Sequence, residues 1–125
     1  HVLEGHEKFV TCLSRGTGDP NIVFSGGEDS KVLVWNIVTG QCLRKISRHH
    51  DWVTDLYVHN DLLLLSACRD GMLRVFNMET GEHIRTLPPS RKDKTSRPQS
   101  LMLMNDHTLV VAEEDGRVRG VSMLI

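Results

Sequence analysis

Three side chains near the start of the sequence, His6, Ser25 and Asp29, have the chemistry of a catalytic triad. In such a triad the imidazole accepts the serine proton and the carboxylate orients the imidazole. A second set in the same order is His49, Ser66 and Asp70. A hydrolase needs one set with an exposed serine on a strained turn, and neither serine here stands in a Gly-x-Ser-x-Gly context. We therefore interpret both sets as structural and predict that the protein is not an enzyme.

A metal site is the second chemistry to consider, because His49, His50, His83 and three cysteines could supply ligands. Neighbouring side chains in a strand point to opposite faces, and the sequence has no Cys-x-x-Cys or His-x-x-x-His spacing. We predict no metal and no cofactor. The cysteines, Cys12, Cys42 and Cys68, are odd in number and widely spaced, which favours packed, reduced thiols and a cytoplasmic or nuclear setting.

The two polar sets belong to a repeat. Residues 25–35 and 66–76 both run from a serine through an acidic turn to an alternating strand that ends on an aromatic residue, Trp35 or Phe76. Corresponding residues lie 41 positions apart. A strand precedes each segment, and a Thr-Gly turn and a further strand follow it, which gives four antiparallel strands in about forty residues. Such a period is typical of the blades of a β-propeller.

We expect an all-β chain that forms a single partial β-propeller domain over residues 1–125. Its blades are predicted at about 1–46 and 47–87, with a degenerate third at 99–125 where Val111 and Val121 take the serine and aromatic positions. Residues 1–4 resemble the end of an outer strand, and residues 62–65 a strand buried on both faces. Residues 88–98 contain three prolines and are predicted to form an exposed, mobile, basic loop. Its cations are Arg91, Lys92, Lys94 and Arg97.

Length and charge narrow the function classes. The 125 residues suffice for one globular domain, and 15 basic against 16 acidic residues leave a net charge of −1. The whole molecule therefore has no electrostatic attraction for nucleic acid or anionic membranes. No apolar run is long enough to span a bilayer. Because the sequence starts at His1 within a strand-like segment, we expect it to be part of a longer one.

These repeats resemble the WD-repeat β-propeller family, in which a repeat begins with Gly-His and ends with Trp-Asp. Gly5-His6 and Arg48-His49 stand at the two starts, and asparagines follow both aromatic residues. The resemblance implies a hydrogen-bonded tetrad of His, Ser, Asp and Trp in each blade: His6, Ser25, Asp29 and Trp35, then His49, Ser66, Asp70 and Phe76. Because Phe76 lacks an indole donor, we expect one hydrogen bond fewer in the second blade. Closure needs roughly four to eight blades, so the remaining blades must come from a longer chain or an oligomer.

The resemblance also implies a non-enzymatic scaffold or adaptor that binds protein partners, with substrate recruitment in a ubiquitin-ligase or signalling complex as a more specific version. Partners would dock on the face that carries the Gly-His and Asp turns. The candidate residues there are Lys8, Phe9, Glu28, Asp51, Trp52 and Arg69. Trp52 is the strongest candidate, because tryptophan is favoured at interface hot spots. The alternative is that Phe9 and Trp52 cap their strands against neighbouring blades.

Nucleic-acid association through the basic loop is the alternative function. The loop has no aromatic residues for base stacking, so a solvated linker is the favoured interpretation. If the alternative holds, binding should depend steeply on salt and be lost when the four loop cations are neutralised.

Overall fold

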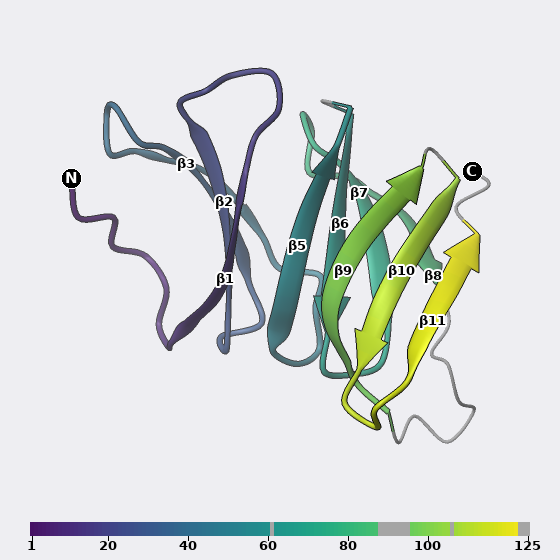
Figure 1. Ribbon diagram of the computed structural model, residues 1–125. Helices are drawn as coiled ribbons and strands as arrows, with labels where there is room; N and C mark the ends of the chain where they lie inside the picture. Colours follow the sequence, from purple (N-terminus) through teal and green to yellow (C-terminus); the bar gives the residue numbers. More distant parts are fainter. Residues whose placement is uncertain (61, 88–95, 106, 123–125) are drawn as a thin grey trace.

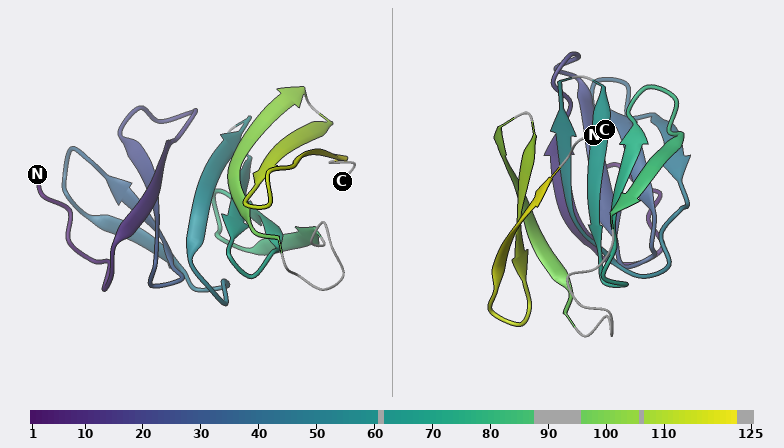
Figure 2. Two further views of the ribbon diagram at one scale, coloured as in Figure 1. Left: turned by 60° about the horizontal axis from the view of Figure 1, so that its bottom comes forward. Right: turned by 90° about the vertical axis from the view of Figure 1, so that its right-hand side faces the viewer.

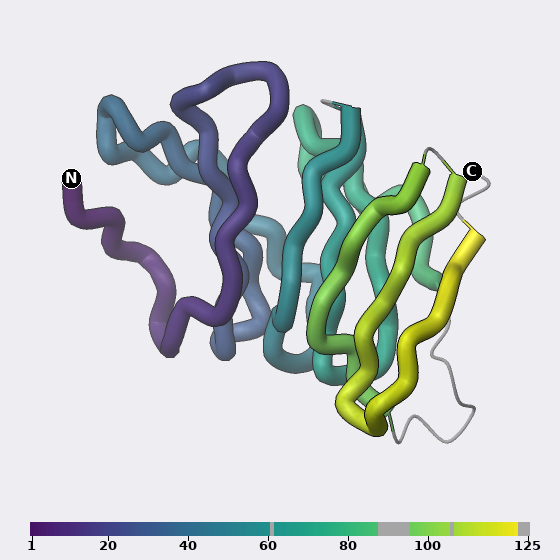
Figure 3. The backbone as a smooth tube through the Cα atoms, viewed as in Figure 1, coloured from purple at the N-terminus to yellow at the C-terminus, as the bar shows by residue number. Residues whose placement is uncertain are grey.

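The computed structural model describes residues 1–60, 62–87, 96–105 and 107–122. The described residues form eleven strands in three antiparallel sheets and no helix, so none of them lies in a helix that could cross a membrane. The chain passes through the three sheets in succession, as the backbone trace in Figure 3 shows. The chain is therefore an all-β incomplete propeller, as predicted.

Each sheet consists of consecutive strands, and we call the sheets the first, second and third blade. The first has the order β1 (Val10–Arg15), β2 (Ile22–Gly27), β3 (Val32–Asn36) and β4 (Cys42–Ile46). The second has β5 (Val53–His59), β6 (Leu63–Cys68), β7 (Leu73–Asn77) and β8 (His83–Leu87). The third has three described strands, β9 (Pro98–Asn105), β10 (Thr108–Glu113) and β11 (Val118–Ser122). The first strands, β1, β5 and β9, lie side by side, and the blades fan out from them (Figures 1 and 2).

The hairpin between the last two strands of each complete blade is fixed by its sequence. Gly40 and Gly81 adopt φ angles of 78° and 74°, a left-handed conformation that a glycine accepts without steric cost. The side-chain oxygen of Asn36 accepts hydrogen bonds from the amides of Val38 and Thr39, at 2.9 and 3.1 Å. Asn77 makes the matching bonds in the second blade. Asparagine therefore supplies the acceptor at the position that follows the aromatic residue.

The core consists of two apolar layers between neighbouring blades. One contains Phe24, Val34, Leu56, Leu64 and Phe76, and the other Leu65, Val75, Leu101, Leu109 and Val111, together with further apolar residues of these and neighbouring strands. Leu64 and Leu65 are both buried but belong to different layers, because successive side chains of a strand point to opposite faces. The second blade is thus buried on both faces, which orders the blades in a row.

The structure corrects three details. Residues 1–4 form no strand, and Leu62 lies in an exposed turn before β6 rather than within it. The predicted basic loop, 88–98, ends too late: β9 already begins at Pro98, and Ser96, only 2% exposed, bonds to Glu113. The end of the loop is buried because it starts the third blade. Arg91, Lys92 and Lys94 lie outside the described residues.

Candidate functional site

The polar network of the first blade joins the four predicted side chains. His6 Nδ1 lies 2.9 Å from a carboxylate oxygen of Asp29, and His6 Nε2 lies 2.6 Å from the hydroxyl of Ser25. The indole of Trp35 donates to the same hydroxyl over 2.8 Å. Asp29 also accepts the backbone amides of Glu7 and Lys31. The network ties the segment before β1 to β2 and β3.

This order of bonds resembles a catalytic triad, but burial prevents the chemistry. Ser25 is 3% exposed, and its hydroxyl already contacts both the His6 ring and the Trp35 indole. Ser25 is therefore not the exposed serine on a strained turn that a hydrolase requires. Burial alone would raise the pKa of Asp29, yet the bond from His6 and the two amides hold that pKa below its usual value. The carboxylate thus stays charged and fixes the ring.

The second blade departs further from the pattern than the sequence predicts. His49 Nε2 lies 2.6 Å from the Ser66 hydroxyl, but Asp70 does not join them. Instead Asp70 forms an ion pair of 2.5 Å with Arg74, because a guanidinium satisfies a carboxylate better than a neutral imidazole does. His49 Nδ1 is left buried without a hydrogen-bond partner among the described residues. Two bonds are therefore missing from the expected tetrad, and not one.

An arginine also organises the third blade. Arg119 lies opposite Val111 in the sheet, as Arg74 lies opposite Ser66 in the second blade. Its Nε is 2.6 Å from the carboxylate of Glu113, which also accepts the Ser96 hydroxyl. Glu113 is 7% exposed, so this ion pair is largely shielded from water. Polar networks thus tie strands together in all three blades, but with different residues.

A repeated backbone bond builds one face of the molecule. In each blade the turn after the second strand folds back and bonds to the residue that directly precedes the first strand. The bonds run from Glu28 to Phe9, from Arg69 to Trp52 and from Glu114 to Arg97, over 2.9, 2.9 and 2.8 Å from amide to carbonyl. We call the surface that these three pairs form the docking face. It brings a variable side chain from every blade to equivalent positions.

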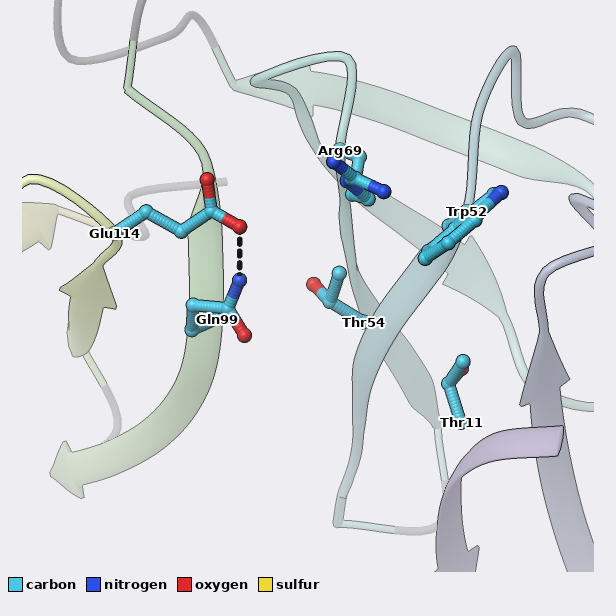
Figure 4. A pocket seen from close by; sticks show the side chains of 6 residues that line it. All are labelled: Thr11, Trp52, Thr54, Arg69, Gln99 and Glu114. Atoms are coloured by element: carbon cyan, nitrogen blue, oxygen red, sulfur yellow. Dashed lines mark hydrogen bonds between the residues drawn. The ribbon is translucent and has the colours of Figure 1, made fainter. Parts of the chain in front are cut away.

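A pocket opens on this face across all three blades (Figure 4). We call it the Trp52 pocket. Its volume is about 350 Å³, and its lining residues are Thr11, Trp52, Thr54, Arg69, Gln99 and Glu114. The Arg69 guanidinium carbon lies 4.3 Å from the centre of the Trp52 ring, a cation–π contact. On the other side of the pocket Gln99 donates to Glu114. Hydroxyls of Thr11 and Thr54 bond to the carbonyls of Val53 and Pro98 in the next blade and hold the blades together.

The chemistry of the Trp52 pocket suits binding. It offers an aromatic ring that is 36% exposed, one cation, one carboxylate and two hydroxyls, but no histidine or cysteine. Within the part of the chain that the structure describes, no three side chains of His, Cys, Asp or Glu converge to hold a metal ion. The pocket can therefore form hydrogen bonds with a ligand, pair with its charged groups and pack against its apolar groups.

Only two of the six partner-binding candidates, Trp52 and Arg69, line the pocket. Phe9 is 77% exposed and packs against neither of the other two described blades, so capping of its strand by a blade outside this sequence stays a prediction. Lys8 is exposed and Glu28 is half-buried, and neither lines the pocket. Asp51 accepts the Trp52 amide over 2.7 Å and thus positions the tryptophan.

Four lining residues escape the sequence analysis: Thr11, Thr54, Gln99 and Glu114. For Glu114 a signal exists, because it follows Arg69 by the 45 residues that separate the second and third repeats. The others share a similar signal, because Thr11, Thr54 and Gln99 are the second residues of β1, β5 and β9 and lie 43 and 45 positions apart. Their convergence in one pocket depends on how the blades sit side by side. Arg97, a predicted basic-loop residue, instead lies on the docking face through its bond to Glu114.

Comparisons with known proteins agree with this architecture. The family model "WD domain, G-beta repeat" matches residues 1–36 and 40–77. The chain is 35% identical over 87 residues to the small ribosomal subunit protein RACK1 of Schizosaccharomyces pombe, which covers 65% of this chain and 28% of RACK1. It is 29% identical over 89 residues to the COMPASS component SWD3 of Saccharomyces cerevisiae, covering 70% of this chain and 28% of SWD3.

A solved structure with the same fold is the crystal structure of RRP9 WD40 repeats. It superposes with a TM-score of 0.85 at 24% sequence identity, over 98% of this chain and 38% of that chain. The chain thus spans less than a third of these two curated relatives and about two fifths of this solved chain.

Proposed function

Because the chain belongs to the WD domain, G-beta repeat family, we propose that it is part of a protein-interaction scaffold that binds a partner in the Trp52 pocket. Members of this family are generally non-enzymatic scaffolds. The observation that carries the proposal is the stacked pair of Trp52 and Arg69 in a pocket to which all three blades contribute. Tryptophan and arginine are the side chains that most often dominate binding energy at protein interfaces.

The ligand should be an extended peptide segment with mixed charge. Arg69 and Glu114 lie on different sides of the pocket, so acidic and basic groups of one segment can be placed at the same time (Figure 4). The exposed part of the Trp52 ring supplies an apolar contact between them. The pocket volume of about 350 Å³ suits one or two side chains rather than a whole domain.

A more specific role within this class is substrate recruitment in a ubiquitin-ligase or signalling complex, in the cytoplasm or nucleus. Two relatives are named as parts of large assemblies, the ribosomal small subunit and COMPASS, which supports a scaffold role. The three cysteines are free in the structure, which is compatible with a reducing compartment. The remaining blades of the propeller would come from a longer chain or an oligomer.

The test compares affinity purifications of the full-length protein and of its Trp52→Ala variant. With Trp52→Ala we expect the recovered amount of any partner that binds the docking face to fall by about tenfold or more, because a hot-spot tryptophan contributes at least about 2 kcal/mol to binding. Phe9→Ala is the matched control, since Phe9 is an exposed aromatic residue of the same face outside the pocket. Equal melting temperatures would show that both variants fold. Unchanged binding by Trp52→Ala, or an equal loss with Phe9→Ala, would contradict the proposal.

A further inference from the structure

A second pocket lies beside the outer strands of the second blade and shares no lining residue with the Trp52 pocket. Its volume is about 320 Å³. The connection from β4 to β5 contributes Ser47, Arg48 and His50, strand β7 contributes Arg74, and β8 contributes His83 and Thr86. We call it the cationic pocket, because its lining has two arginines and two histidines and no carboxylate.

Some side chains of the lining are held by contacts with other described residues, and two others are not. Arg74 has a side chain only 7% exposed and is held by its ion pair with Asp70, the nearest acid. His83 contacts Phe76 edge-on and bonds to the Thr86 hydroxyl over 2.8 Å. Arg48 and His50 are exposed and make no hydrogen bond or ion pair with any described residue. Their donors are thus available to a ligand.

The pKa of the buried residue His49 is affected by side chains that line this pocket. His49 lies behind the pocket, 7% exposed, and its Nδ1 has no hydrogen-bond partner among the described residues. Burial is the main reason why the pKa of His49 falls to about 3, and Arg74, His50 and His83 lower it further. Asp70 alone acts in the opposite direction. The residues that line the pocket therefore disfavour a proton on His49.

The fold itself does not require this charge, as the equivalent place in the first blade shows. The residues at the six positions there are Glu4, Gly5, Glu7, Leu33, Cys42 and Lys45. Two glutamates, an apolar residue and one lysine replace the cationic set. The cationic pocket is thus not repeated in the first blade, and structural demands common to these two blades do not explain it.

We propose that the cationic pocket binds a phosphoryl group, either of a phosphomonoester or of the free ion, between Arg48, His50, His83 and the rim of Arg74. The planar guanidinium of arginine matches two phosphate oxygens at once, and a phosphoryl group offers only acceptors to a lining that is rich in donors. Ser47 and Thr86 can add hydroxyl donors. The volume exceeds that of a phosphate ion, so part of the esterified group can enter as well. This site is independent of the proposed docking function.

The experiment measures binding of inorganic phosphate and of O-phosphoserine to the full-length protein by isothermal titration calorimetry, with serine as the uncharged comparison. We expect saturable binding of at least one phosphate compound and none of serine. Replacing both unengaged groups, in Arg48→Gln with His50→Gln, should weaken binding by about tenfold or more, since each charge-assisted bond contributes strongly. Arg15→Gln, a change at an exposed arginine of the first blade, should leave binding unchanged.

Location is tested by chemical protection. Diethyl pyrocarbonate modifies accessible imidazoles, and mass spectrometry identifies the modified residues. The bound phosphate compound should protect His50 and His83 but not His107, which is exposed in the third blade. Preferred binding of phosphoserine would assign the group to a modified protein, and preferred binding of inorganic phosphate to the free ion; both support the site. Binding of neither compound, or protection that includes His107, would overturn the proposal.

Discussion

In the first blade the Ser25 hydroxyl is shared between the His6 ring and the Trp35 indole, whereas in the second blade His49 is the only partner of the Ser66 hydroxyl among the described residues. The difference arises from single residues. Phe76 has no N–H to donate, and Arg74 draws Asp70 away from the histidine. A buried polar network is stabilising only when its members form hydrogen bonds. Because Asp70 binds Arg74 in place of His49, the Nδ1 atom of His49 has no hydrogen-bond partner among the described residues, which destabilises the second blade.

This unpaired, buried histidine predicts a dependence of stability on pH. The pKa of His49 is about 3 in the folded protein, because of burial and then of Arg74, against an ordinary value of 6.5 in the unfolded chain. Between these values the unfolded state binds more protons than the folded state. His49 should therefore contribute no pH dependence to the free energy of unfolding above pH 6.5, and its contribution should lower that free energy as the pH drops toward 3. Urea denaturation at a series of pH values measures it.

Two variants isolate the contribution of His49. His49→Gln cannot titrate, so its free energy of unfolding should depend less on pH between 6.5 and about 4. This range lies above 3.8, the ordinary pKa below which Asp29 and Asp70 lose their stabilising contribution. His107→Gln, at an exposed histidine, should retain the dependence of the original protein. If the His49→Gln protein loses stability with the same slope as the original, another group carries the effect.

At the scale of elements, the connection that enters each blade is matched to the aromatic residue at the end of the third strand. A Cβ atom built on Gly5 would lie 2.9 Å from the Trp35 ring and 3.2 Å from Leu33, so only glycine fits there. In the second blade the corresponding residue is Arg48, and the aromatic residue is the smaller Phe76. The loss of the indole therefore makes room for a side chain, and that side chain lines the cationic pocket.

This pairing predicts that restoring the family's tryptophan will not stabilise the second blade. Phe76→Trp should lower the free energy of unfolding by about 1–3 kcal/mol, because the larger ring meets the Arg48 side chain. Adding Arg48→Gly should recover most of this loss, although Arg48→Gly alone gains nothing. A double-mutant cycle from denaturation curves measures the coupling. A Phe76→Trp protein that is more stable than the original, with Arg48 present, would show that the two positions do not compete.

At the scale of the whole molecule, three blades stand in a row and only the second is covered on both faces (Figure 1). The first blade exposes Val10 and Leu13 on its outer face, next to the buried tetrad. In the third sheet, β11 has β10 as its only described neighbour. Exposed apolar faces and unpaired strand edges favour association with further strands or blades.

We therefore expect a polypeptide that consists of residues 1–125 alone to associate with itself or to aggregate. Sedimentation velocity should show several species whose proportions change with concentration, and thermal melting should be broad. Leu13→Lys, which places a charge on the exposed face of the first blade, should shift the distribution toward smaller species. A single sharp monomer boundary together with cooperative melting would refute this prediction.

Much of the fold could be predicted because repetition makes local signals reinforce each other. The acidic turns, the Thr-Gly hairpins and the alternating strands recur at fixed spacing, so each copy supports the other. Prediction was weaker where a copy departs from the pattern. The entry to the third blade looked like a basic linker, yet Ser96 and Pro98 are buried there because Glu113 and β10 lie behind them.

The sequence by itself determined the all-β blades and their order, since these follow from short-range patterns of polarity and turn residues. The four-residue tetrad of the first blade followed from the resemblance to the WD-repeat family. Only the tertiary structure decided which side chains from different blades share a pocket. Glu114 faces Arg69 and Trp52, and Asp70 prefers Arg74 to His49, because of distances between strands that no local spacing encodes. Burial was also decided there, and it is burial that makes Ser25 a structural residue and leaves Trp52 open to a partner.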